Sequence, residues 1–67
     1  MKISGRNQII AKVKEISHGG IMAKVVLDFH GVDLVSVITN DSAADLDIKI
    51  GDEVTAIIKS TSVMLMK

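Results

Sequence analysis

The sequence contains no cysteine, proline, tryptophan or tyrosine, and Phe29 is its one phenylalanine. Without cysteine, disulfide bonds and thiolate metal sites are excluded. With a single aromatic ring, the chain lacks the stacking platforms that single-stranded nucleic acids need. Eight basic residues balance eight acidic ones, so the basic excess of a typical nucleic-acid binder is also missing. These absences argue against RNA or DNA as a partner.

Long apolar runs are absent as well. No run approaches the roughly 18 residues of a membrane-spanning helix, and the first residues, Met-Lys-Ile-Ser-Gly-Arg, lack the apolar region of a signal peptide. We therefore expect a cytoplasmic protein with no membrane partner.

The chain contains more apolar residues than a domain of its length can easily bury. Its 67 residues suffice for one domain, residues 1–67, and 48% of them are hydrophobic. A domain this small buries only about 60% of the surface that its unfolded chain exposes. Because neither disulfides nor a zinc site can staple it, we expect a homo-oligomer in which contacts between subunits supply the missing stability.

Apolar and polar residues alternate with the period of two that is typical of strands. The pattern predicts strands over residues 9–16, 21–29, 34–39 and 53–59, and after the break at Ser60-Thr61 we expect a fifth, short strand over residues 62–66. Both faces of the third are apolar, which indicates a strand covered on both sides or a subunit contact. Between the third and fourth, one or two helical turns are expected, with Ser42 and Asp45 in a capping-box arrangement. This order predicts an all-β fold, a five-stranded Greek-key barrel of the oligonucleotide/oligosaccharide-binding (OB) type.

Two clusters of hydrogen-bond donors lie near the ends of the chain. The first is Ser4-Gly5-Arg6-Asn7-Gln8 and the second is Lys59-Ser60-Thr61-Ser62. Each could be a polar turn that faces water. The ends of a compact domain often lie close together, however, and the joint set would hold two cations and several hydroxyls without a carboxylate. Such a donor-only set suits an anion with many acceptor oxygens, such as a tetrahedral oxyanion.

The Gly19-Gly20 pair is a third candidate. Paired glycines tolerate a positive φ and predict a hairpin turn, and exposed amides of a turn can also cradle an anion.

His18 and His30 lie in turns twelve residues apart. Since a metal site needs three or four convergent ligands and no nucleophile is evident beside either histidine, we expect neither a protein-bound metal nor catalytic residues.

Four segments in order resemble the molbindins, the Mop family of small molybdate-binding proteins related to TOBE domains. They are Ser4-Gly5-Arg6-Asn7-Gln8; Ile38-Thr39-Asn40-Asp41-Ser42 followed by Asp45-Leu46-Asp47-Ile48; Gly51-Asp52-Glu53-Val54-Thr55-Ala56; and Ile58-Lys59-Ser60-Thr61-Ser62-Val63-Met64. The resemblance extends over essentially the whole chain.

The resemblance implies an OB-like barrel completed by strand exchange within a dimer. It further implies a hexamer, a trimer of dimers, that binds molybdate or tungstate between subunits without an organic cofactor. The positions that match the family's oxyanion contacts are Ser4, Arg6, Asn7, Gly19, Gly20, Lys59, Ser60, Thr61 and Ser62.

The leading hypothesis is therefore a non-enzymatic protein that stores or buffers molybdate or tungstate. Two rivals stay open. One is an assembly or regulatory module of OB type with no ligand of its own, and the other is a nucleic-acid-binding OB domain, whose affinity would fall steeply with salt.

Overall fold

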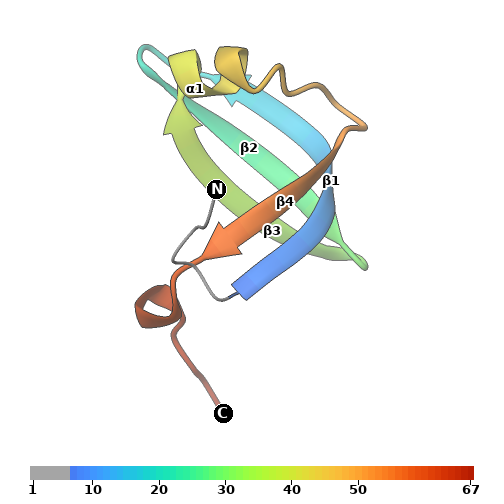
Figure 1. Cartoon of the computed structure of the whole chain (residues 1–67), viewed down its shortest axis with the longest axis vertical. Coiled ribbons are helices and arrows are strands. Elements are labelled where there is room, and N and C mark those ends of the chain that lie inside the picture. Colours follow the sequence, from blue (N-terminus) through green and yellow to red (C-terminus); the bar gives the residue numbers. More distant parts are fainter. Residues whose placement is uncertain (1–6) are drawn as a thin grey trace.

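A strongly curved antiparallel sheet and one short helix make up the computed structural model, which describes residues 7–67 (Figure 1). The elements are β1 (Asn7–His18), β2 (Met22–Phe29), β3 (Val32–Thr39), α1 (Asn40–Asp45), β4 (Glu53–Ile58) and the 3-10 helix η1 (Ser60–Ser62). The strand order is β3-β2-β1-β4. Three consecutive strands with the fourth beside the first form a Greek key, so the predicted all-β class and the short helix between the third and fourth strands are confirmed.

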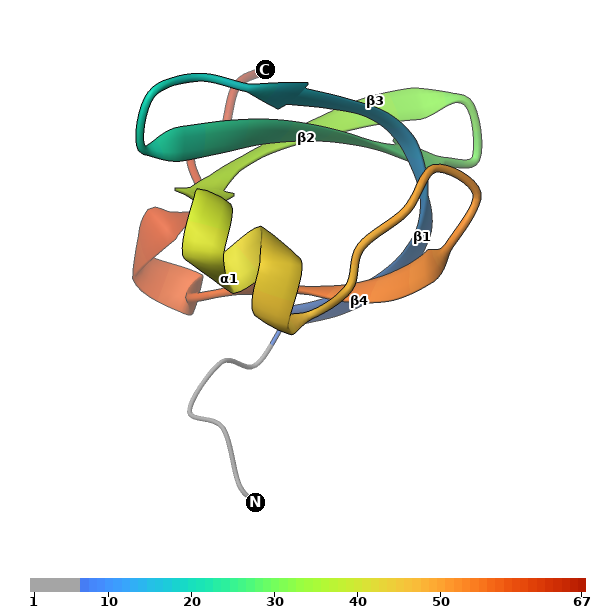
Figure 2. The same ribbon diagram turned by 90° about the horizontal axis from the view of Figure 1, so that it is seen from above.

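β1 belongs to both halves of the sheet. From Lys12 to His18 it pairs with β2, and from Asn7 to Lys12 it pairs with β4. Between Val13 and Glu15 the register with β2 shifts by one residue, a β-bulge. Because a bulge bends a strand and increases its twist, the sheet curls around its inner face, as Figure 2 shows.

The observed strand ends differ from the predicted ones by one or two residues. β1 is longer at both ends, because Asn7 still pairs with Ile58 and His18 with Ala23. β3 begins earlier than expected, since His30 and Gly31 have φ angles of 51° and 86°. Two successive positive φ angles are typical of the tight two-residue turn that keeps hairpin strands in register.

The helix begins differently from the prediction. Its N-cap is Thr39, whose Oγ1 accepts a hydrogen bond of 3.0 Å from the Ser42 amide. The predicted capping box of Ser42 and Asp45 is therefore wrong. Thr39 ends β3 in an extended conformation, which is the backbone geometry that an N-cap residue needs. No helix in residues 7–67 is long and apolar enough to cross a bilayer.

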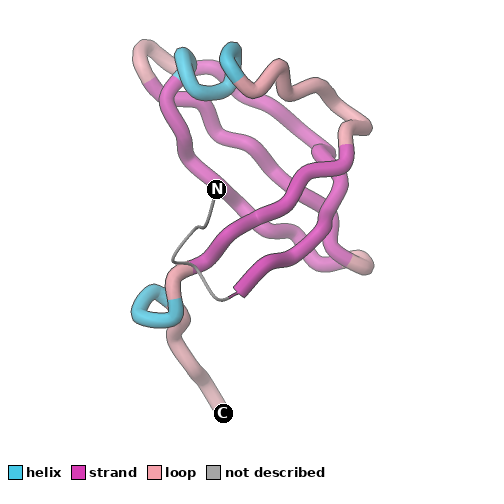
Figure 3. Tube along the Cα trace, in the orientation of Figure 1, coloured by secondary structure: helices cyan, strands magenta, loops and turns pink. Residues whose placement is uncertain are grey.

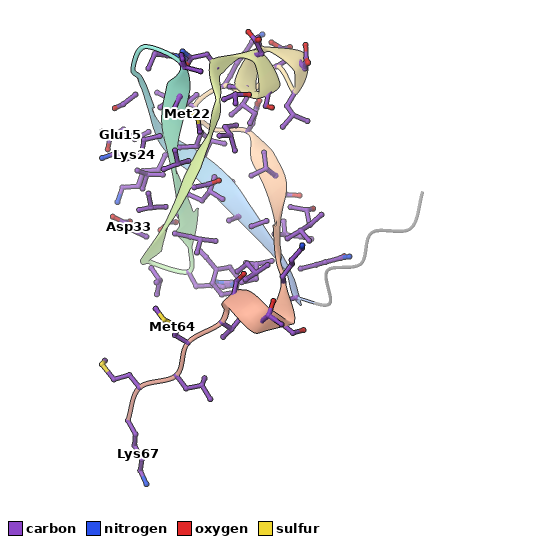
Figure 4. The ribbon with its side chains drawn as sticks, turned by 90° about the vertical axis from the view of Figure 1, so that its left-hand side faces the viewer. Glu15, Met22, Lys24, Asp33, Met64 and Lys67 are labelled. Atoms are coloured by element: carbon purple, nitrogen blue, oxygen red, sulfur yellow. The ribbon has the colours of Figure 1, made fainter. Side chains whose placement is uncertain are left out.

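The predicted fifth strand does not form within the chain. Residues 60–62 form η1, and residues 63–67 then extend away from the sheet without pairing to a strand of residues 7–67 (Figures 3 and 4). The sheet therefore has four strands. The side chains of Met64, Leu65 and Met66 are 93%, 93% and 99% exposed. The apolar sequence that predicted a strand is present, but residues 7–67 provide no partner for it.

Alternating inward residues of the four strands form a small core. It is centred on Ala11, Val13, Val25 and Leu27. In residues 7–67 only seven apolar side chains are buried, whereas thirteen large apolar side chains are exposed. Val35 and Val37, on the outer face of β3, are 58% and 59% exposed. The single chain thus leaves uncovered the apolar surface that the composition indicates.

A groove of about 780 Å³ runs between the two edge strands, β3 and β4, which do not pair with each other. Val25 and Leu27 of the core contribute to its lining, and so do Leu46 and Ile48 from the segment after α1. Lys59 and Ser62 also line it. The barrel is therefore open along one side, and the open side leads into the apolar interior.

Candidate functional site

The pairing of β1 with β4 brings parts of the two donor clusters together. Asn7 is the register partner of Ile58, and Lys59 follows Ile58 directly. Asn7, Ile58 and Val63 also line a shallow hollow beside the seam of these strands. Ser4 and Arg6 of the first cluster lie outside the described residues. The described end of the first cluster, Asn7 and Gln8, therefore lies beside the strand end that leads into the second cluster, where β1 begins and β4 ends.

Residues 59–62 leave the sheet in a single tight turn. Lys59 is still extended, with φ −63° and ψ 140°, and the Ser62 amide then donates a 2.9 Å hydrogen bond to the Lys59 carbonyl. All four residues are exposed. The hydroxyls of Ser60, Thr61 and Ser62 have no hydrogen-bond partner within residues 7–67. The turn thus presents three free hydroxyl donors beside one ammonium group.

The charge of Lys59 is not balanced by a neighbouring carboxylate. Lys14 forms an ion pair with Asp33 at 2.8 Å and Lys49 with Asp47 at 3.7 Å. The hydrogen bond to Asp33, and then the negative charge of Asp33, raises the pKa of Lys14 above its ordinary value. For Lys59, no carboxylate oxygen of residues 7–67 lies within 4.0 Å. A multivalent anion is a suitable partner for such a cation beside hydroxyl donors.

The Gly19-Gly20 turn lies at the opposite end of β1 from Asn7 (Figure 1). A single chain therefore does not bring the third candidate to the other two. The predicted hairpin turn between β1 and β2 is confirmed, and it forms without the positive φ that glycine tolerates, because Gly31 and Gly51 are the described glycines with positive φ. The turn is closed by the Gly19 amide, which donates to the Met22 carbonyl at 2.8 Å.

Asn40, the first residue of α1, makes hydrogen bonds to this turn that the sequence analysis did not predict. Its Nδ2 donates to the carbonyls of Gly19 and Gly20 at 3.3 and 3.2 Å, and its backbone amide donates to the Ile21 carbonyl at 2.8 Å. Its Oδ1 lies 3.0 Å from His18 Nδ1. The only feature of the sequence that pointed to this role was an asparagine at the junction of a strand and a helix. Such an asparagine is equally typical of a helix N-cap.

The histidines are engaged in local contacts rather than gathered with other ligands. The ring of His30 packs edge-on against Phe29 with 4.5 Å between the centroids. No three His, Asp or Glu side chains of residues 7–67 are grouped so that they could hold a metal ion. Within the described part of the chain, the chemistry on offer at the donor clusters is hydrogen bonding and positive charge.

Comparison with known proteins places these features in a family. The sequence pattern of the TOBE domain matches residues 3–65. The chain is similar to molybdenum-pterin-binding protein 3 of Clostridium pasteurianum, with 49% identity over 67 residues that cover 98% of each chain.

Solved structures agree with this similarity. A molybdate-binding protein from Sporomusa ovata superposes with a TM-score of 0.95 at 55% sequence identity and full coverage of both chains. The cytoplasmic molybdate-binding protein ModG, in a form with molybdate bound, superposes with a TM-score of 0.88 at 32% identity. That match covers 96% of this chain and 46% of ModG.

Proposed function

Because this chain belongs to the TOBE domain family, we propose that it binds molybdate or tungstate between the subunits of a homo-oligomer. The observation that carries the proposal is the meeting of Asn7 with the exposed Lys59–Ser62 turn, a set of donors without a carboxylate. Relatives named for binding molybdate or molybdenum-pterin support the choice of anion. In this proposal the whole chain, residues 1–67, is one oxyanion-binding domain with no catalytic residue.

Each residue of the set has a chemical role in the proposal. Arg6 and Lys59 supply positive charge, and Arg6 adds a planar fork of donors. Ser4 and Asn7 from one cluster and Ser60, Thr61 and Ser62 from the other supply neutral donors to the oxygens of the tetrahedral anion. Backbone amides at Gly19 and Gly20 provide a further place for anion contact at the other end of β1.

The need for several subunits follows from the cost of removing a dianion from water. A charge-assisted hydrogen bond contributes only roughly 1.5–3 kcal/mol, and the two donor clusters of one chain contain two cations, Arg6 and Lys59. Donors from more than one subunit would raise that total. The same association would cover the exposed apolar side chains of the isolated chain.

The groove between β3 and β4 and the C-terminal segment indicate how the subunits associate. The groove is lined mostly by apolar side chains and flanked by two strand edges that have no partner within residues 7–67. Residues 63–66 are four exposed apolar residues. Open strand edges readily pair with another chain. In the proposal this segment supplies the missing fifth strand to a partner, and three such dimers form a hexamer.

In the cell, the proposed role is storage or buffering of the bare oxyanion in the cytoplasm, without an organic cofactor. A cytoplasmic relative that binds molybdate supports this location. A pterin-linked metal is the alternative ligand, because some relatives are named for it. Titration with molybdate and with a molybdenum-pterin compound would separate the two.

The direct test is isothermal titration calorimetry with sodium molybdate at physiological salt, with sulfate as competitor. We expect saturable binding that sulfate displaces poorly. Lys59→Ala should weaken binding by about 1–3 kcal/mol, since one charged donor is lost. Lys49→Ala is the matched control, because it removes an exposed lysine that is already ion-paired to Asp47.

An unchanged affinity of the Lys59→Ala protein would remove Lys59 from the site. The absence of any binding to the unmodified protein would instead favour the second candidate, an assembly module without its own ligand. The large exposed apolar surface independently favours assembly, so this candidate predicts an oligomer with no affinity for the anion.

A further inference from the structure

The turn between β1 and β2 is held from outside by one residue, through its side chain and its backbone amide. Three consecutive carbonyls, those of Gly19, Gly20 and Ile21, all accept hydrogen bonds from Asn40. The turn and the start of α1 lie side by side in Figures 1 and 2. The Gly19 amide bonded to the Met22 carbonyl and the pairing of His18 with Ala23 hold the turn from within the hairpin.

The two carbonyl oxygens of the turn fix the direction of the Asn40 amide. Both Nδ2 contacts of Asn40 are carbonyl oxygens, which only accept, so the nitrogen must face them. The Asn40 oxygen then faces His18 Nδ1 at 3.0 Å and accepts a hydrogen bond from it. The opposite orientation would set the Asn40 oxygen against two carbonyl oxygens and is excluded. The positions of the Asn40 amide oxygen and nitrogen are therefore assigned from their hydrogen-bond partners.

The direction of the carbonyls determines where the amides of the turn point. All described peptide bonds are trans, and in a trans peptide the N–H points opposite to the carbonyl of the same peptide unit. Since the carbonyls of Gly19 and Gly20 point toward Asn40, the amides of Gly20 and Ile21 point away from it. Neither amide has an acceptor within residues 7–67, and both residues are exposed.

Two successive free amides on one side of a turn form a concavity that attracts anions. Glycine, however, has the greatest backbone freedom of any residue, so a Gly-Gly turn would sample many directions for these amides. Anion binding would then have to order the turn, and ordering lowers affinity. The Asn40 hydrogen bonds remove that freedom before a ligand arrives.

We propose that Asn40 is a positioning residue for oxyanion binding at the turn: it holds the carbonyls of Gly19 and Gly20 so that the amides of Gly20 and Ile21 face the anion. The inference rests on the proposed function and deepens it, because it assigns the turn a pre-ordered pair of donors. His18 supports Asn40 and does not itself need to touch the ligand.

The test is a titration of the full-length, ¹⁵N-labelled protein with sodium molybdate, followed at the amide resonances of Gly20 and Ile21. Asn40→Ala removes the three side-chain contacts. Asn40→Asp keeps the shape but sets carboxylate oxygens against two carbonyls. Ser42→Ala is the matched control, since it removes the hydroxyl bonded to Thr39 Oγ1 at the same end of α1 and leaves the turn contacts in place. Thermal denaturation of each variant reports any loss of folding separately.

In the unmodified protein we expect molybdate to shift the Gly20 and Ile21 resonances. In Asn40→Ala and Asn40→Asp the affinity measured at these amides should fall roughly tenfold, equal to about 1.4 kcal/mol, while Ser42→Ala keeps the original affinity. A lower melting temperature of the Asn40 variants with unchanged affinity would overturn the inference and make the contacts purely structural. If molybdate binds without shifting the Gly20 and Ile21 resonances, the role of Asn40 is overturned while the proposed function stands. No binding at all would overturn both.

Discussion

At the residue scale, Gly19 and Gly20 have different surroundings although they are neighbours. A Cβ on Gly19 would lie 3.2 Å from the Met22 carbonyl oxygen, whereas a Cβ on Gly20 would meet nothing within 4 Å. The Met22 carbonyl cannot easily give way, because it accepts the Gly19 amide that closes the turn. Neither glycine has the positive φ that penalises other residues.

We therefore predict opposite effects of two alanine substitutions. Gly20→Ala should leave the free energy of unfolding unchanged or raise it by about 0.4–1 kcal/mol, because alanine has fewer unfolded conformations to lose. Gly19→Ala should lower it through the close contact with Met22. Urea denaturation of both variants at one protein concentration checks this, and equal stabilities would contradict the assignment of the close contact to Gly19.

Sequence patterns predicted the donor clusters but not how the residues between them are arranged. The pairing of Asn7 with Ile58, directly before Lys59, could be expected because chain ends of small domains lie close together. The Asn40 contacts could not be expected from the sequence, because they join residues about 20 apart along the chain and depend on how α1 is placed. The N-cap was assigned to the wrong residue for a related reason. Thr39 reads as the last residue of a strand, and only the turn of the chain after it makes it a cap.

At the scale of elements, four of five predicted strands are present, with ends shifted by one or two residues. Alternation identifies a strand that is half-buried in its own chain, as in β2, where Ala23, Val25 and Leu27 face inward and are buried. The segment 62–66 is a short apolar run without this alternation, and it is no strand within residues 7–67. A pattern reports that a segment suits a sheet, but it does not say to which chain the sheet belongs.

We predict that deletion of residues 63–67 will dissociate the oligomer. The deleted segment is exposed and apolar and makes no strand pairing within residues 7–67, so its loss should not disturb the four-stranded sheet directly. Light scattering after size exclusion should show a shift to smaller assemblies, and circular dichroism should show that the sheet is retained. Deletion of Lys67 alone is the control. An unchanged assembly after the longer deletion would contradict the proposed strand exchange.

At the scale of the whole molecule, the proposed anion binding and the stability of the fold both depend on association with partner subunits. The isolated chain buries seven apolar side chains among its described residues and exposes thirteen large ones, and its donor clusters offer few charges per chain. Partner subunits would supply both apolar cover and further donors. Stability should accordingly rise with protein concentration and with molybdate, since both favour the assembled state by mass action.

Native mass spectrometry with and without sodium molybdate can show whether the anion is held between subunits. We expect a homo-oligomer, a hexamer in the proposed arrangement, that retains molybdate, while dissociated monomers in the same spectrum carry none. Monomers that retain molybdate, or an oligomer that carries none at saturating molybdate, would contradict this expectation.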